Sequence, residues 1–268
     1  MTFALVASHV TLSGSGFTEP ARFSLADRCA AAAAAGFTGI GLHTNDLSPT
    51  SSVDPIRAHG LELVEIEFLS GWALGTDLAT VTSTEQRAFA VADQVGARYL
   101  SAGEYHSGPL NFARAAAALH ERCARAAVHG LRIAVEPFPW SAIRDVPTAL
   151  RLLELADTPN AGLLLDTWHF FTAGGRIPDL ARIPPDLIVA VQLNDGPSTV
   201  SGDLLTVSRN TRLLPGDGTF DLRSVIRVLS ESGYDGVYTA EIGNPAFRAL
   251  PVEEAAHLAY EKVQRLFT

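Results

Sequence analysis

Short apolar runs alternate with longer alanine-rich or amphipathic stretches along the whole chain. A short continuous apolar run bounded by turn residues is typical of a strand that is buried on both faces, as in a parallel sheet. The longer stretches have helical character, and several end at the residue favoured just past a helix: Gly36, Gly60, Gly96 and Gly130. The pattern therefore predicts a repeated strand–helix unit.

The predicted strands and helices alternate eight times, in units of about thirty residues. The strands are predicted at Phe3–Ser8, Gly39–His43, Leu61–Phe68, Arg98–Gly103, Leu131–Glu136, Ala161–Asp166, Leu187–Gln192 and Gly236–Glu241. The helices are predicted at Ser24–Ala35, Val53–His59, Thr84–Val95, Asn111–His129, Val146–Ala156, Pro178–Arg182, Phe220–Glu231 and Val252–Phe267. Because nothing along the chain resembles a linker, the alternation predicts an α/β protein, a single (β/α)8 TIM barrel spanning residues 1–268.

An open, doubly wound parallel sheet has the same alternation and is the alternative fold. Such a sheet normally carries a glycine-rich phosphate turn directly after its first strand. The turn Gly14-Ser15-Gly16 lies near that position, but it lacks the third glycine and does not immediately open a helix. The barrel is therefore the favoured fold.

Composition and charge narrow the class of protein. The chain has 268 residues, a formal net charge of −9 and no block of Lys or Arg, which argues against a nucleic-acid surface and leaves a small polar or anionic substrate open. Cys29 and Cys123 form neither a disulfide framework nor a zinc motif. No basic leader or long apolar run is present, so we expect a soluble, cytoplasmic protein with no membrane partner.

Four successive strands end in a side chain that carries oxygen: Glu136, Asp166, Gln192 and Glu241. In a barrel, the carboxyl ends of the strands meet at one mouth, so these side chains become neighbours. Three carboxylates packed together repel one another unless a divalent cation neutralises them. Oxygen ligands favour Mn²⁺ or Mg²⁺, with Co²⁺ possible. The sequence thus predicts a metal site at this mouth, although acidic residues at strand ends can also be solvated loop residues or helix N-caps.

Other residues near these strand ends are candidates for contact with a substrate. His169 is a candidate base three residues after Asp166, with a half-buried structural histidine as the alternative. Trp140 and Trp168 follow two of the proposed ligands and either wall the pocket or simply pack beside it. The remaining candidates are Arg212, which precedes a tight turn and otherwise forms a surface salt bridge, and Glu67 and His106 near the ends of strands three and four.

These residues together resemble a known family. Val135-Glu136-Pro137, Leu165-Asp166-Thr167-Trp168-His169, Val191-Gln192-Leu193-Asn194-Asp195, Arg212 with Pro215-Gly216-Asp217-Gly218, and Ala240-Glu241 resemble the xylose isomerase-like TIM-barrel superfamily of sugar phosphate isomerases and epimerases. The resemblance implies one divalent ion held by Glu136, Asp166, Gln192 and Glu241. It also implies that His169 and Arg212 lie beside the substrate and that Glu136 and Glu241 act as acid and base groups.

Gln192 departs from the ketose epimerase pattern, which usually has histidine at this position. A glutamine there, together with Trp140 and Ser208-Arg209, is similar to the 3-dehydroshikimate dehydratase branch of the same superfamily. An amide still offers an oxygen ligand, but it does not carry a proton between groups. The resemblance therefore covers two kinds of reaction.

The first functional hypothesis is a divalent-metal-dependent isomerase or epimerase that acts on a ketose or keto-cyclitol through an enediolate. The second is a lyase that dehydrates a cyclic β-hydroxy ketone such as 3-dehydroshikimate. A binding module without catalysis is a third, and an endonuclease for abasic DNA is disfavoured by the charge of −9. The expected partner is a small polyhydroxy ketone, not nucleic acid, and a homo-oligomer is compatible with such barrels.

The segment from Asp195 to Pro215 is too long and too polar for an ordinary connection between a strand and a helix. Long connections in compact domains often carry function. We therefore predict that this segment is a functional loop or lid.

Overall fold

The parallel strands close into one barrel in chain order, with β1 hydrogen-bonded to β8. The structure is a computed structural model that describes residues 4–17, 19–46 and 53–268. The strands are β1 (Ala4–Ala7), β2 (Gly39–His43), β3 (Glu62–Leu69), β4 (Tyr99–Ala102), β5 (Arg132–Val135), β6 (Ala161–Asp166), β7 (Ile188–Leu193) and β8 (Val237–Ala240). The predicted (β/α)8 barrel is confirmed, and the doubly wound alternative is excluded because the sheet has no open edge.

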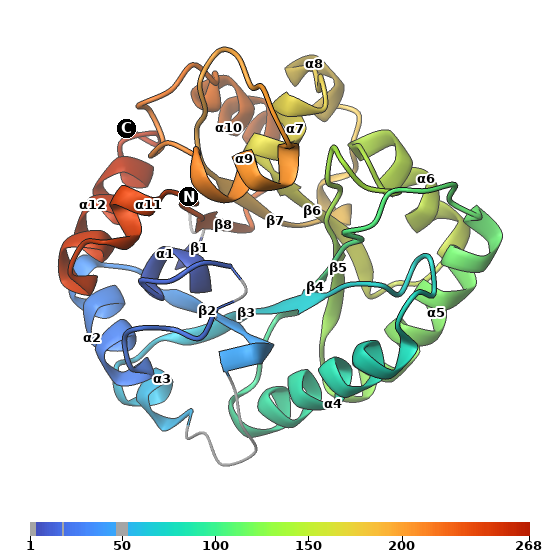
Figure 1. The fold of residues 1–268 in the computed structure, drawn as a ribbon, viewed down its shortest axis with the longest axis horizontal. Helices are drawn as coiled ribbons and strands as arrows, with labels where there is room; N and C mark the ends of the chain where they lie inside the picture. Colours follow the sequence, from blue (N-terminus) through green and yellow to red (C-terminus); the bar gives the residue numbers. More distant parts are fainter. Residues whose placement is uncertain (1–3, 18, 47–52) are drawn as a thin grey trace.

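The helices form a ring around this barrel (Figure 1). The longer ones are α2 (Leu25–Ala35), α4 (Leu78–Val95), α5 (Phe112–Val128), α6 (Val146–Ala156), α10 (Leu222–Glu231) and α12 (Val252–Gln264). The shorter ones are α1 (His9–Leu12), α3 (Asp54–Ala58), α7 (Thr167–Thr172), α8 (Ile177–Leu180), α9 (Leu204–Asn210) and α11 (Pro245–Arg248), with 3-10 turns at Thr44–Asp46 and Pro185–Leu187. None of the helices in the described part of the chain combines the length and apolar character that a membrane crossing needs.

Apolar side chains pack in two regions, as expected for a barrel inside a ring of helices. The larger core lies between the strands and the helices. The smaller core fills the barrel interior and contains Val6, Val64, Tyr99, Ala134, Leu164, Val189, Ala190 and Val237. Interior side chains at the carboxyl ends of several strands are instead polar, so the barrel changes from an apolar floor to a polar mouth.

The structure refines the predicted boundaries at several places. The predicted strand start at Phe3 lies outside the described residues. Helix α4 starts at Leu78 and not at Thr84, because Asp77 accepts a hydrogen bond from the backbone N–H of Thr80 and caps an earlier turn. The proposed lid segment contains the helix α9, which begins after the N-cap Asp203.

The unit after β6 lacks a long outer helix. Short α7 follows β6 directly, and α8 packs against α10 on the outside of the ring. Asp166 accepts a hydrogen bond from the backbone N–H of His169 and so caps α7. This arrangement turns the chain sharply at the carboxyl end of β6 and keeps His169 beside the strand ends.

Candidate active site

The four side chains proposed as metal ligands ring one half of the barrel mouth. Glu136 directly follows β5, Asp166 and Gln192 lie on β6 and β7, and Glu241 directly follows β8. Asp166 pairs in register with Gln192, which pairs with Thr239 on β8, so neighbouring strand ends carry these groups. All four side chains are buried, at 6%, 1%, 1% and 4% exposure in chain order. Barrel closure therefore brings together residues that are far apart in the sequence.

The guanidinium of Arg212 lies among these carboxylates. Its Nη1 donates hydrogen bonds to Asp166 Oδ2 at 2.6 Å and to Glu241 Oε2 at 2.7 Å. Its Nε donates to the backbone carbonyl oxygen of Ser208 at 3.0 Å. Arg212 is only 2% exposed, which excludes the surface salt bridge considered from the sequence. It is a buried counter-ion of the acidic cluster.

The imidazole of His169 completes the cluster. Its Nε2 lies 3.1 Å from Arg212 Nη2 and 3.5 Å from Glu136 Oε1. Because a guanidinium nitrogen donates only, Nε2 accepts this bond and the neutral ring carries its proton on Nδ1. Burial lowers the pKa of His169 to about 3, with Arg212 lowering it further and Asp166 opposing the shift. The lone pair of Nε2 therefore faces Arg212, and the imidazole can accept a proton or bind a metal ion there once this hydrogen bond is given up.

The carboxyl groups differ in the direction of their pKa shifts, although Asp166 and Glu241 lie at similar distances from Arg212. Burial favours the neutral form of Asp166, but the charge of Arg212 outweighs it, so the pKa of Asp166 lies below its usual range. Burial raises the pKa of Glu136, and the charges of Glu241 and Asp166 add to the rise. Burial also raises the pKa of Glu241 against the opposing effect of Arg212. When all three carboxyl groups are ionised, their negative charge exceeds the single positive charge of Arg212, and another cation is needed to neutralise the rest.

The donor atoms fit a divalent metal ion. Glu136, Asp166 and His169 each offer one ligand atom, and these atoms lie within 4.8 Å of one another. Gln192 Oε1 is buried and has no hydrogen-bond partner among the described residues, and a buried carbonyl oxygen without a partner is costly. Such a set of oxygens with one imidazole suits a range of divalent ions.

A small cavity lies over this cluster and has an aromatic wall. Tyr105 stacks on Phe138 with ring centroids 5.3 Å apart, and Phe138 stacks on Trp140 at 5.0 Å. Glu136, His169, Gln192 and Glu241 also line the cavity. Its free volume is about 30 Å³, close to the volume of one water molecule. A ring-sized substrate therefore requires part of the wall to move.

The other predicted contact residues fall at different places. Trp140 and Glu67 line the cavity, and Glu67 Oε1 accepts a hydrogen bond from the backbone N–H of His9 at 3.1 Å. Trp168 is fully buried, and its ring packs perpendicular to the imidazole of His169, so it helps to fix the position of that imidazole. The side chain of His106 is 63% exposed and bonds to Glu104, away from the cavity lining.

The structure adds lining residues that the sequence analysis did not propose as contacts: Phe17, His43, Phe68, Tyr105, Phe138 and Leu205. Tyr105 and Phe138 each follow the end of a predicted strand by a few residues, and this position could have identified them from the sequence. Phe17 and Leu205 come from connections whose path depends on tertiary packing, so no local pattern identifies them.

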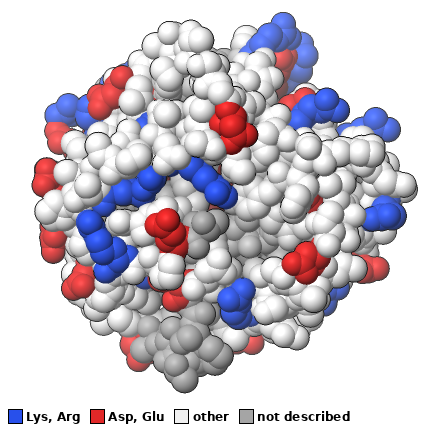
Figure 2. All heavy atoms as spheres, viewed as in Figure 1, with Lys and Arg blue, Asp and Glu red and all other residues white. Residues whose placement is uncertain are grey.

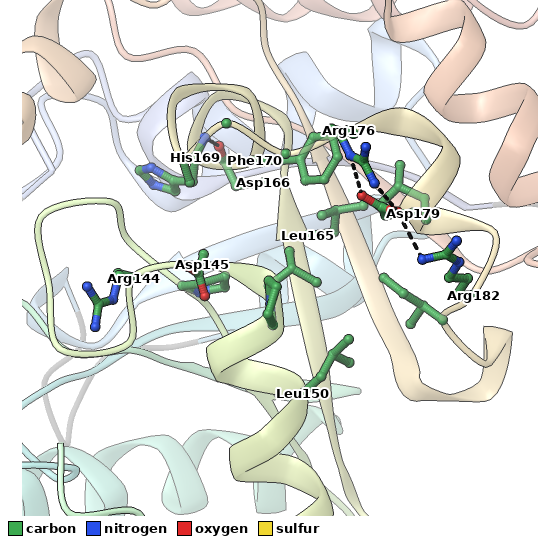
Figure 3. A pocket seen from close by; sticks show the side chains of 18 residues that line it. Arg144, Asp145, Leu150, Leu165, Asp166, His169, Phe170, Arg176, Asp179 and Arg182 are labelled. Carbon is green, nitrogen blue, oxygen red and sulfur yellow. Dashed lines mark hydrogen bonds and ion pairs between the residues drawn. The ribbon is translucent and has the colours of Figure 1, made fainter.

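A second cavity of about 470 Å³ lies outside the barrel, between α6 and the α7–α8 segment (Figure 3). It occupies the place where the unit after β6 lacks a long outer helix. Its lining is mainly apolar, and Asp179 pairs there with Arg176 at 2.9 Å and Arg182 at 3.3 Å. Asp166 and His169 border it from the barrel side. The smaller cavity at the mouth is the one that gathers the groups capable of acid–base chemistry.

Basic side chains gather on the face that carries the mouth. Arg248 donates a hydrogen bond to the backbone carbonyl oxygen of Arg209 at 2.8 Å, and Arg22 donates to that of Arg248 at 3.2 Å. Figure 2 shows Lys and Arg atoms in an arc on this face, beside a small acidic area. This local charge contrasts with the net charge of −9 of the chain.

A closed eight-stranded barrel with acidic groups and an imidazole at the carboxyl ends of its strands defines a TIM-barrel protein with a candidate divalent-metal centre. The chain belongs to the xylose isomerase-like TIM barrel family, whose model matches residues 29–264. The resemblance found in the sequence is thereby confirmed.

The relatives that match this chain include a dehydratase and an isomerase. The chain is 32% identical to a 3-dehydroshikimate dehydratase of Pseudomonas aeruginosa over 264 residues, which cover 87% of this chain and 38% of that protein. It is 29% identical to an inosose isomerase of Halalkalibacterium halodurans over 146 residues, 52% of this chain and 51% of the relative. Thus the chain spans well under half the length of the first relative, and these matches include both dehydration and isomerisation.

Solved structures share the fold. The crystal structure of the IOLI protein with a bound zinc atom superposes with a TM-score of 0.85 at 19% identity, covering 98% of each chain. A probable 3-DHS dehydratase, AsbF of Bacillus anthracis, superposes with a TM-score of 0.75 at 14% identity, covering 98% of this chain and 99% of that one. At such identities the likeness establishes the fold of the barrel.

Proposed function

We propose that this protein is a divalent-metal-dependent lyase that dehydrates a cyclic β-hydroxy ketone bearing a carboxylate, such as 3-dehydroshikimate. The match to a named 3-dehydroshikimate dehydratase over 87% of this chain supports the proposal. Among the sequence hypotheses, this is the second one, and an isomerase for a ketose or keto-cyclitol was the first. The reason for preferring the lyase is a basic side chain on the cavity wall.

That side chain is Arg209, the observation that carries the proposal. Arg209 lines the cavity with Gln192 and Glu241, and its guanidinium carbon lies 5.5 Å from the ring centroid of Tyr105. None of the ion pairs found within residues 4–17, 19–46 and 53–268 includes Arg209, whereas Arg212 is already held by two carboxylates. A cation on the wall suits a carboxylate on the substrate. Ketoses and inososes have no such group.

The chain's own residues supply most of the chemistry. We assign the ligand role to Glu136, Asp166, Gln192 and Glu241, and the ion they hold polarises the substrate carbonyl group when it is bound. His169 Nε2 gives up its hydrogen bond from Arg212 and accepts the proton from the carbon next to that carbonyl group. The hydroxyl on the following carbon leaves with this proton as water, which returns His169 to its neutral form. A second loss of a ring proton to the carbonyl oxygen leaves an aromatic product.

The test is proton NMR in D₂O of the manganese-loaded protein with 3-dehydroshikimate, inososes and ketoses in separate tubes. The proposal expects an aromatic product in the first tube. Proton exchange or a new diastereomer in a sugar or inosose tube, with no aromatic product in the first, would establish the isomerase instead.

Variants of the cavity residues sharpen this test. Arg209→Met is expected to raise KM for the carboxylate substrate by about tenfold or more with a small change in kcat, because it removes a binding charge. His169→Gln is expected to lower kcat by roughly 10²–10⁴-fold. Arg176→Met, at an exposed ion pair, is the matched control. Full turnover in Glu241→Gln would indicate that the site is assigned wrongly, and no turnover of any substrate by the wild type would favour a binding module.

A further inference from the structure

Gln192 poses an orientation problem that a histidine or a carboxylate does not. An amide has an oxygen end that binds cations and a nitrogen end that only donates hydrogen bonds. The two ends have nearly the same shape, so packing alone discriminates poorly between them. A glutamine ligand therefore needs a neighbour that recognises one end.

Glu65 is placed to recognise the nitrogen end of the Gln192 amide. Gln192 Nε2 donates a hydrogen bond to Glu65 Oε1 at 3.2 Å, across the interior of the barrel from β7 to β3. Glu65 is 0% exposed and Gln192 is 1% exposed, so water does not compete for this bond. With its nitrogen end engaged, the amide leaves Oε1 at the cavity that Glu136, His169 and Glu241 also line, and no residue in the described part of the chain hydrogen-bonds to this oxygen.

Besides Gln192, the hydroxyl of Tyr99 is a polar neighbour of Glu65. Glu65 lies in register with Tyr99, which belongs to the apolar floor, and Gln192 lies in register with Thr239, so the pair lies where the floor meets the polar mouth. Burying a carboxyl group in a barrel interior is costly unless the group has a polar partner. Whether ionised or protonated, the group keeps an oxygen that accepts a hydrogen bond. If the amide were turned around, its oxygen would face Glu65 Oε1, and two acceptors would meet there unless that oxygen carried a proton.

We propose that Glu65 is a positioning residue that holds the Gln192 amide with its carbonyl oxygen toward the divalent ion. The inference rests on the metal site described under the proposed function and adds a residue that touches neither the ion nor the substrate. It makes a specific claim, namely that the strengthening of metal binding by Glu65 depends on Gln192.

The test measures the dissociation constant of Mn²⁺ by electron paramagnetic resonance of the free ion, with no turnover required. Glu65→Met keeps the volume and removes the acceptor, and it is expected to weaken Mn²⁺ binding by roughly 10–100-fold. Gln192→Ala is expected to weaken binding by about tenfold or more. In the double variant, Glu65→Met should add less than about threefold to the effect of Gln192→Ala. Glu65→Gln keeps an acceptor oxygen and should stay within about threefold of the wild type.

The outcomes separate the inference from the site on which it rests. If Glu65→Met binds Mn²⁺ like the wild type, or weakens binding equally with and without Gln192, the inference is wrong while the metal site stands. A tenfold loss in Glu65→Gln also overturns it, even if Glu65→Met does not fold. If Gln192→Ala binds Mn²⁺ normally, the ligand set itself is wrong and both proposals fall.

The matched control is Glu104→Met. Glu104 is another fully buried acid, but its oxygens accept hydrogen bonds from Leu74 and His106 and not from Gln192. It should leave the Mn²⁺ dissociation constant unchanged. Thermal unfolding of each metal-free variant reports separately on the stability of the fold.

Discussion

Arg212 and the carboxylates around it set the electrostatics of the mouth residue by residue. The guanidinium is held by Asp166 and Glu241, with Glu136 nearby and also buried. Arg212 thus compensates part of the acidic charge, and the remainder is available for a metal ion. The same carboxylates serve the protein with and without that ion, so stability and metal binding are linked here.

Replacing Arg212 by Met should therefore destabilise the metal-free protein by about 3–5 kcal/mol, because buried carboxylates lose their partner. Saturating Mn²⁺ should then raise the urea midpoint of the variant by more than that of the wild type, since the ion neutralises the same groups. Urea unfolding with EDTA and with Mn²⁺ measures both effects. Equal Mn²⁺ effects in the two proteins would contradict the linkage. Arg176→Met, at an exposed pair, should leave the midpoint unchanged.

His43, at the end of β2, gives the fold a dependence on pH. Burial lowers its pKa from 6.5 to about 4, against the opposing charge of Asp46. As the pH falls from about 6.5 to about 4, the unfolded chain takes up a proton before the native state does, so stability is complete above this window and is lost within it. This one group accounts for at most about 3 kcal/mol.

His43→Gln should flatten the pH dependence of the unfolding free energy in this window, measured by urea unfolding at several pH values. His9 is also buried with a lowered pKa, so the variant should retain part of the slope. His257→Gln, on the exposed face of α12, is the matched control and should keep the full slope. An unchanged slope in His43→Gln would mean that other groups carry the acid sensitivity.

Among the structural elements, α9 controls the space above the acidic cluster. Leu205, Ser208 and Arg209 of this helix line the cavity, whose free volume is too small for a ring-shaped substrate. The helix begins where the side chain of Asp203 accepts a hydrogen bond from the backbone N–H of Thr206 at 2.9 Å. A short helix depends strongly on such a cap. We therefore expect α9 to move when substrate enters, in keeping with the predicted lid.

Asp203→Ala should make the segment 197–211 roughly three to ten times more sensitive to limited proteolysis, because the cap that starts α9 is lost. Metal together with substrate should protect this segment in the wild type. Mass spectrometry of the fragments measures both. Asp221→Ala removes the corresponding cap of α10, at Ser224, and should not change cleavage in 197–211. Cleavage there that ignores metal and substrate would argue against a lid.

Considered as a whole, the molecule combines an acidic chain with a basic arc around its mouth (Figure 2). The net charge of −9 argues against the extended positive surface that nucleic-acid binding needs. The local arc suits a small anion, because charge near the entrance raises the local concentration of an oppositely charged ligand. This contrast agrees with a substrate carboxylate at Arg209.

Much of the fold was predictable because its signals are local. Apolar runs and the glycines after helices predicted the strands and most long helices, and their alternation predicted the barrel. The short helices α1, α7, α9 and α11 were not predicted, since pieces of this length form only with tertiary support. The side chains with oxygen atoms at the ends of β5 to β8 were visible for the same local reason, since each interrupts an apolar run.

The sequence by itself determined the barrel and the residues at its strand ends, because hydrophobic periodicity and chain order are enough to specify them. Only the tertiary structure decided which groups touch. It placed Arg212 between Asp166 and Glu241, and it set Glu65 against Gln192, 127 positions away in the chain. Such contacts depend on strand register and on barrel closure, and neither is encoded within any local stretch of the sequence.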